Sequence, residues 1–334
     1  MMTADEILGL VQKAPEPRTT ERPWYISLML GVAGWFAGLL LLIFAGALFR
    51  PDKAPGAIAL GAVLVAAAFG LFKVDRNGTF VSQLALALSI AGQVLLLFGL
   101  HEGFFKGLGG STSITSIAFV ALVIQLALIP IMPSHLHRTM STLFASVAWA
   151  VFVRYALWDR PMFFDWNRSE KHVGPSFVMA LLGWLAAWGP AAGALYMLIR
   201  KEPAWMAAGR HEVARPVATG LIVGLAFGTI LSQPFESLAF LGAGSVRENW
   251  LAIWPLLSAL ASLGALLAAF ALGARGLMGI CVLAALLHMS HFYYAMGTSL
   301  LLKSLMMMVM GAGCLVAAWK LRHATLPGRP RQAR

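Results

Sequence analysis

The sequence predicts an all-α membrane protein, a bundle of about ten transmembrane helices with both termini in the cytoplasm. Hydrophobic residues make up 59% of the 334 residues and charged residues only 12%, whereas soluble domains carry about 25% charged residues. Mean hydropathy is +0.78. The apolar residues form runs of about 20, the length that a helix needs to cross a bilayer. At membrane depth a helix satisfies its own backbone hydrogen bonds, so each run predicts a helix.

Ten apolar runs follow one another with mostly short loops between them, as in one bundle. They cover residues 24–49, 56–73, 79–100, 113–132, 139–157, 176–199, 215–233, 249–272, 275–294 and 297–319. The second and ninth are shorter or less cleanly bounded. We expect a transmembrane domain over 24–320, a cytoplasmic tail over 1–23 and a basic cytoplasmic tail over 321–334. A capping-box pattern over 3–6 predicts either a short amphipathic helix or a frayed end in the first tail.

The distribution of basic residues sets the orientation. Sixteen Lys and Arg residues fall on the side of the N-terminus and seven on the other side, which favours both termini inside. The net charge of +11 is spread over short loops, so it indicates contact with anionic lipid and excludes a nucleic-acid partner. The two cysteines, Cys281 and Cys314, lie inside apolar runs, which predicts free thiols.

Glycines at intervals of four residues predict close helix packing. Gly34 and Gly38 lie in the first run, and Gly220, Gly224 and Gly228 lie in the seventh. Small residues at this spacing let two backbones approach closely in a membrane. We therefore interpret both groups as helix-packing positions.

Prolines and glutamines inside the runs have two interpretations each. Pro190 and Pro234 either kink or end their helices, or they mark broken helices that line a cavity. Gln83, Gln93 and Gln125 either form hydrogen bonds across helices or line a pathway.

Polar residues gather at the ends of several spans, all on the outer side of the membrane in the predicted orientation. The candidate cluster comprises His101, Glu102, Arg154, Gln233, Glu236, His288, His291, Tyr294 and Lys303. Ionisable groups inside a membrane are costly and are functional candidates for that reason. The alternative is that the long basic side chains snorkel to the headgroups and that the tyrosine is an interfacial anchor.

His288 and His291 project from one helix face because they are three residues apart. A hydrogen-bonded structural role, contact with a proton or substrate, and metal or haem ligation are the three interpretations. The sequence has no H-E-x-x-H, Walker or G-x-S-x-G motif. We therefore predict no catalytic residue, no metal and no cofactor. The outer loop 158–174 could cover the cluster or rest at the membrane interface.

Two segments resemble a known family. GTFVSQLALALSIAGQVLLLFGL (78–100) and HFYYAMGTSLLLKSLMMMVMGAGCLVAAW (291–319) are similar to bacterial membrane proteins grouped as domain of unknown function 4401. The approach to the first span, PWYISLMLGVAGWFAGLLLL (23–42), resembles them too, so the resemblance extends from the first span to the last. It implies a multi-pass protein of the bacterial inner membrane with no assigned activity. It also implies gene neighbours that encode another polytopic protein and a small membrane-anchored protein with a GDYxxLxY motif.

Two functional hypotheses follow. In the first, the chain is a subunit or scaffold of a membrane complex with other small or polytopic membrane proteins. In the second, it is a permease or small-solute binder whose polar cluster forms an outward-facing cavity. The missing motifs argue against an intramembrane enzyme.

Overall fold

The computed structural model describes residues 24–49, 53–74, 79–106, 114–158, 177–232, 253–295 and 299–323. Within these ranges every regular element is a helix, which confirms the all-α prediction. The predicted N-terminal amphipathic helix, most of the loop 158–174, Gln233, Pro234, Glu236 and the chain after 323 lie outside the described residues.

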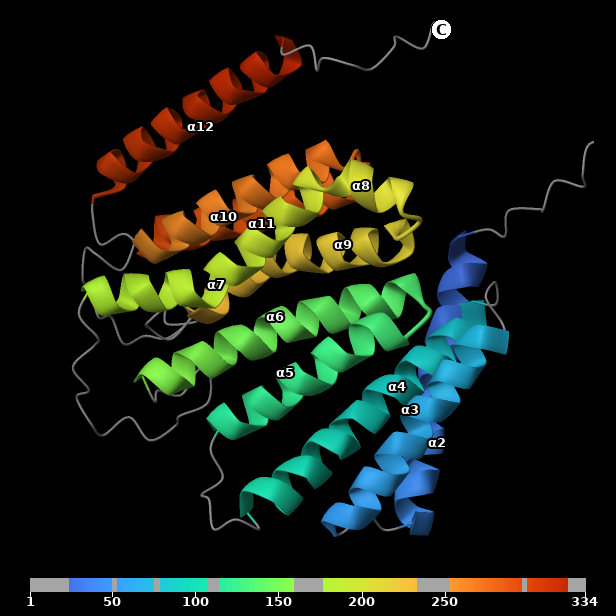
Figure 1. Cartoon of the computed structure of the whole chain (residues 1–334). Helices are drawn as coiled ribbons and strands as arrows, with labels where there is room; N and C mark the ends of the chain where they lie inside the picture. Colours follow the sequence, from blue (N-terminus) through green and yellow to red (C-terminus); the bar gives the residue numbers. More distant parts are fainter. Residues whose placement is uncertain are drawn as a thin grey trace, which may run out of the picture. The chain divides into compact units, whose positions relative to one another are not determined.

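Contacts divide the chain into two compact units, Met1–Gly110 (unit 1) and Ser111–Arg334 (unit 2), and each is described by itself. Unit 1 contains α2 (Trp24–Phe49), α3 (Ala54–Val74), α4 (Thr79–Leu100) and a π-helical continuation, η1 (His101–Lys106). In Figure 1 these are the blue and cyan helices. Helix α4 packs against both α2 and α3, so it is the centre of this unit.

The predicted glycine pair of the first span faces α4. A Cβ atom on Gly34 would lie 2.9 Å from Cβ of Gln83, and one on Gly38 would lie 2.5 Å from Cβ of Ala87. Both distances are too short for a real side chain, so the two helices touch through the glycine surfaces. The indole of Trp35 also donates a hydrogen bond of 3.1 Å to Oε1 of Gln83.

A second glycine contact, between α3 and α4, is not among the predicted positions. A Cβ atom on Gly61 would lie 2.8 Å from the Gly92 carbonyl oxygen, and one on Gly92 would lie 2.7 Å from the Gly61 carbonyl oxygen. Further along α4, a Cβ atom on Gly99 would lie 2.7 Å from Cγ1 of Ile58. The two backbones therefore meet directly where both helices lack a side chain.

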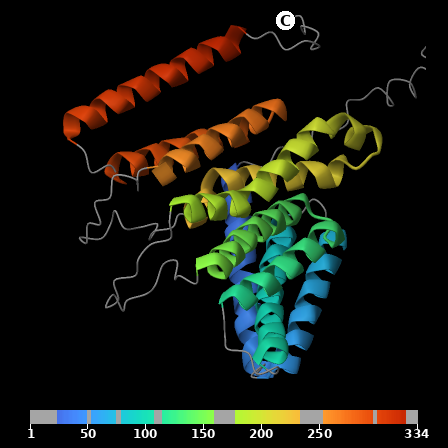
Figure 2. The same cartoon turned by 60° about the vertical axis from the view of Figure 1, so that its left-hand side comes forward.

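Unit 2 is built around α9. Its elements are α5 (Ile114–Ile131), α6 (His135–Trp158), α7 (Phe177–Arg200), the short α8 (Glu202–Ala207), α9 (His211–Phe227), η2 (Gly228–Ser232), α10 (Ile253–Ala271), α11 (Arg275–Ala295) and α12 (Leu300–His323). Helix α9 contacts α6, α7, α10 and α11, and both views show it among them (Figures 1 and 2). The buried core includes Trp188, Ile222, Leu225 and the free thiol Cys281.

Helices α6 and α9 run parallel, and the glycines predicted in the seventh span lie between them. A Cβ atom on Gly220 would lie 2.6 Å from the Thr139 carbonyl oxygen, and one on Gly224 would lie 3.3 Å from Cβ of Ser146. Gly228 faces the ring of Trp188 from α7. Residue numbers in these contacts rise together along α6 and α9, so the two helices point in the same direction.

Eight helices in the described part of the chain are long and apolar enough to cross a membrane. The first and last helices, α2 and α12, contain the shorter apolar segments Met29–Leu41 and Leu300–Val309. The chain is therefore a multi-pass membrane protein, as predicted. Pro190 does not end its helix, because α7 continues through it, and α8 is a helix that the hydropathy pattern does not predict.

Candidate functional site

Polar side chains collect at one end of unit 2, where α6, α9 and α11 end and where α10 and α12 begin (left in Figure 1). Of the predicted cluster, Arg154, His288, His291, Tyr294 and Lys303 lie at this end. His101 and Glu102 belong to η1 in unit 1. The structure thus places these five described members at the same end of unit 2.

His288 is bonded to a main-chain carbonyl of a neighbouring helix. Its side chain is 3% exposed, and its Nε2–H donates a hydrogen bond of 2.8 Å to the carbonyl oxygen of Ala226 in α9. The hydroxyl of Ser262 in α10 lies 2.9 Å from the same oxygen and 3.0 Å from the Ser258 carbonyl oxygen of its own helix, so its one proton is shared between two acceptors. One oxygen of α9 therefore holds a side chain from α10 and a side chain from α11.

The end of α9 explains why this carbonyl attracts two donors. At Gly228 the chain changes from α-helix to the tighter 3₁₀ helix η2, so the Ala226 carbonyl lies where the regular ladder of α-helical hydrogen bonds is interrupted. In a membrane such a group needs a protein donor, because lipid tails offer none. Ser262 and His288 supply donors, and together they tie α9, α10 and α11 at this end.

Lys303 lies beside the aromatic pair at the end of α11. Its Nζ atom is 5.1 Å from the ring centroid of Tyr293, within reach of a cation–π interaction. Tyr293 in turn meets Tyr294 edge-on, with ring centroids 5.5 Å apart, and Tyr294 is 65% exposed. His291, three residues after His288, is only partly buried. This geometry suits an interfacial anchor for the start of α12.

Arg154 is the most buried charged residue among the described members of the cluster. It lies one turn before the end of α6 and is 2% exposed. A guanidinium group inside a membrane span is costly unless surrounding groups compensate its charge. Within the described residues no group of three or more His, Cys, Asp or Glu side chains is arranged to hold a metal ion.

Two prolines inside helices each leave a main-chain carbonyl without its usual N–H donor, and side chains of α6 donate to these oxygens instead. The sequence pattern did not predict this feature. Proline has no N–H, so Pro190 cannot donate to the carbonyl of Ala186, four residues earlier. The indole N–H of Trp149 in α6 donates to that oxygen instead, at 3.0 Å. The side chain replaces the missing backbone bond, and α7 remains helical across the proline.

The second case is in α9, where Pro216 leaves the Glu212 carbonyl without its usual donor. Nη1 of Arg138 donates to this oxygen at 2.8 Å. The hydroxyl of Thr139 lies 3.3 Å from the carbonyl oxygen of Pro216 itself, although its shorter bond, at 3.0 Å, is to the His135 carbonyl of its own helix. The prolines are visible in the sequence, but the donors that compensate for them lie on another helix.

An apolar groove of about 280 Å³ lies between α5 and α6. Its lining includes Ile117, Phe144, Val147 and Val151, and its one polar lining residue is Gln125, which is 7% exposed. All of these residues belong to helices that can cross a membrane. The groove is therefore suited to apolar material and not to an ion.

Comparison with known proteins identifies a family for this chain but no individual relative. Residues 23–249 match the family described as domain of unknown function (DUF4401). No curated protein and no solved structure matches the chain. The match includes the segments 23–42 and 78–100 that suggested the resemblance, whereas the segment 291–319 lies beyond it. Because the matched residues make up more than half of the chain, the protein is a multi-pass membrane protein that belongs to the DUF4401 family.

Proposed function

We propose that the protein is a subunit or scaffold of a bacterial inner-membrane complex, with both termini in the cytoplasm. The observation that carries this proposal is how the polar groups at the end of unit 2 are used. His288 and Ser262 both donate to the Ala226 carbonyl. These bonds hold three helices in place, which is the task of a structural subunit, and they leave less hydrogen-bonding capacity for a transported solute.

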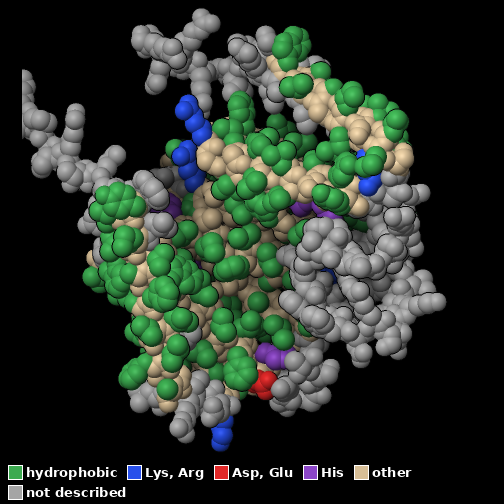
Figure 3. All heavy atoms as spheres, turned by 180° about the vertical axis from the view of Figure 1, so that it is seen from behind, with side chains coloured by type: hydrophobic (Ala, Val, Ile, Leu, Met, Phe, Trp, Pro, Cys, Tyr) green, Lys and Arg blue, Asp and Glu red, His purple; other side chains and the backbone are tan. Residues whose placement is uncertain are grey.

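The exposed surface supports the same proposal. On α2, Met29, Phe36 and Phe44 are each more than 60% exposed, and on α12 the same holds for Leu301 and Leu315. The face seen in Figure 3 is mostly hydrophobic, with Lys and Arg side chains at its margins. Lipid covers such surfaces in a monomer, and helices of other small or polytopic membrane proteins can replace lipid without loss of apolar contact.

The experiment is purification of the tagged full chain from its native membrane after cross-linking, followed by native mass spectrometry in mild detergent. We expect other membrane proteins to be present in a fixed ratio to the chain. An unrelated polytopic protein with the same tag, expressed at the same level, is the control. A clean monomer in both cross-linked and untreated samples would count heavily against the proposal.

The alternative is a permease or small-solute binder, and the buried charge of Arg154 favours it. A cation that is 2% exposed inside a span is a typical feature of a substrate or ion pathway. Arg154→Gln and Lys303→Ala should then abolish solute-dependent growth while the protein still inserts. Lys73→Gln, in unit 1, is the matched control. Wild-type growth of both test variants across a solute panel would leave only a structural role for the cluster.

A further inference from the structure

We propose that the turn between α7 and α9 binds the headgroup of an anionic phospholipid. The cations that contact the phosphate are Arg200, Lys201 and Arg210, and the aromatic rings of Tyr196 and Trp205 orient two of them. The inference concerns the opposite end of unit 2 from the polar cluster, and it does not depend on the scaffold proposal.

The backbone of this turn fixes where Arg210 lies. Helix α8 ends in a Schellman motif, in which the N–H of Gly209 donates to the Met206 carbonyl at 3.1 Å and the N–H of Arg210 donates to the Trp205 carbonyl at 2.9 Å. Gly209 has φ of 67°, a conformation that glycine adopts without strain. The motif therefore returns the chain so that Arg210 lies beside Trp205.

Two arginines lie against aromatic rings. Cζ of Arg210 is 6.0 Å from the ring centroid of Trp205, and Cζ of Arg200 is 5.5 Å from that of Tyr196. Both arginines and Lys201 are exposed. A guanidinium group that stacks on a ring keeps its donor edges free, and this edge matches two oxygens of a phosphate.

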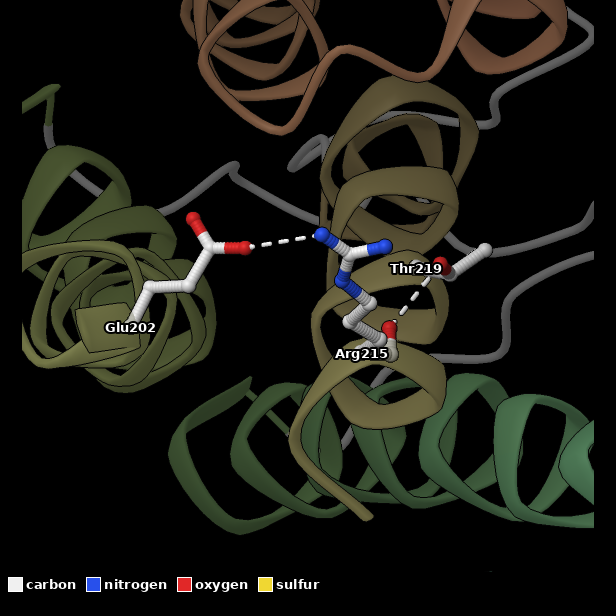
Figure 4. Close-up of polar contacts among 3 residues, drawn as sticks. All are labelled: Glu202, Arg215 and Thr219. Atoms are coloured by element: carbon white, nitrogen blue, oxygen red, sulfur yellow. Dashed lines mark hydrogen bonds and ion pairs between the residues drawn. The ribbon is translucent and has the colours of Figure 1, made fainter. Parts of the chain in front are cut away.

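The carboxylate of α8 is already paired with a different arginine. Figure 4 shows that Oε1 of Glu202 meets Nη2 of Arg215 at 3.3 Å. The same arginine's carbonyl accepts the Thr219 hydroxyl at 3.0 Å. This pair links α8 to α9 and gives one of the two carboxylates of the turn a partner other than the three proposed cations.

The three proposed cations differ from Arg215 in their ion pairing. Among the described residues no carboxylate forms an ion pair with Arg200, Lys201 or Arg210. The other acid of the turn, Glu212, is exposed at the start of α9, and its backbone carbonyl, not its carboxylate, accepts the Arg138 bond. The turn thus carries a surplus of positive charge that an anion can neutralise.

The position of the turn selects a lipid as the anion. Arg200 ends one candidate span, Phe177–Arg200, and Glu212 begins another, Glu212–Ile230. The cations therefore lie at the depth of the headgroups, where tyrosine and tryptophan are favoured. Met206 is 48% exposed beside Trp205, so α8 has an apolar side chain that can enter the acyl region.

The test measures lipids retained by the purified full-length protein. Native mass spectrometry is run after titration with phosphatidylglycerol or phosphatidylcholine, for the wild type and for Arg200→Gln/Lys201→Gln/Arg210→Gln. We expect the wild type to retain phosphatidylglycerol preferentially. We expect the affinity to fall about fivefold for each cation removed. Arg275→Gln is the matched control, because Arg275 is an exposed arginine after the second Schellman turn, at Gly273, and should leave binding unchanged.

Several outcomes would overturn the proposal. Equal retention of the two lipids by the wild type, or undiminished phosphatidylglycerol binding by the triple variant, would show that no specific headgroup site exists here. Displacement of the lipid by millimolar inorganic phosphate would assign the turn to free phosphate instead. If the triple variant does not fold, the single variant Lys201→Gln and the charge-preserving variant Arg210→Lys decide the matter. The first should lose about fivefold in affinity, and the second should retain most of it.

Discussion

Replacing Trp149 by phenylalanine tests whether α6 holds α7 together across its internal proline. The change removes the indole N–H that donates to the Ala186 carbonyl at 3.0 Å. Leaving a carbonyl without a donor costs about 1–3 kcal/mol where water cannot replace the donor. Pro190→Ala provides a backbone N–H for the same oxygen, so in that background the loss should shrink by about 1 kcal/mol or more. The stacking of Trp149 on Phe152, with centroids 5.8 Å apart, is altered in both backgrounds and cancels.

The assay is reversible unfolding of the four purified proteins in mixed micelles with increasing dodecyl sulfate. The coupling free energy is the difference between the two Trp149→Phe effects, and distant, independent changes agree within about 0.3–0.5 kcal/mol. Trp184→Phe is the control, because its indole has no acceptor among the described residues and should show no coupling to Pro190→Ala. A coupling energy for Trp149 no larger than that of the control would refute the reasoning.

Three further changes can be measured in the same unfolding assay. Gly61→Ala should destabilise by about 1–3 kcal/mol through overpacking, because its Cβ would lie 2.8 Å from a backbone oxygen of α4. Gly70→Ala, in the same helix with nothing within 4 Å, should be neutral or stabilise by up to about 1 kcal/mol; equal effects would contradict the packing. His288→Phe removes one of two donors to the Ala226 carbonyl and should cost about 1 kcal/mol; no loss would argue against the tie between these helices. Gly209→Ala places a side chain at φ of 67° and should cost about 1–2 kcal/mol; an unchanged midpoint would mean that the turn relaxes.

The spans were predictable because an apolar run of about 20 residues matches the length of a helix that crosses a bilayer. The apolar run 79–100 coincides with α4 (Thr79–Leu100), since hydropathy alone decides where such a helix can lie. The fifth span begins earlier than predicted, at His135 and not at 139. Its first turn contains His137, which is 1% exposed, and Arg138, which is 8% exposed. Hydropathy cannot predict that polar residues are buried when the groups that satisfy them lie on another helix.

The candidate site was predictable only in part, for a related reason. Counting spans was enough to place the histidine at 288 at the same end as Arg154 and Lys303, as the structure has them in unit 2. The partner of His288 is a main-chain oxygen of Ala226, and alanine gives no sequence signal for this role. The carbonyls that Pro190 and Pro216 leave without a donor could be predicted from the sequence, because each proline removes the hydrogen bond to the carbonyl four residues earlier. Only the structure identifies the donors.

The parallel contact between α6 and α9 has a consequence for how the protein is made. Thr142 and Ser146 face glycine surfaces of α9, and Arg138 bonds a carbonyl of the same helix. Helix α9 is synthesised only after α7 and α8, so α6 leaves the ribosome well before the surface that buries its polar side chains. During that interval Arg138 lacks the Glu212 carbonyl that it bonds in the folded protein, whereas Thr142 and Ser146 already donate to carbonyls of α6 itself. The face of α6 that meets α9 therefore waits for its partner until two further helices, α7 and α8, have been made.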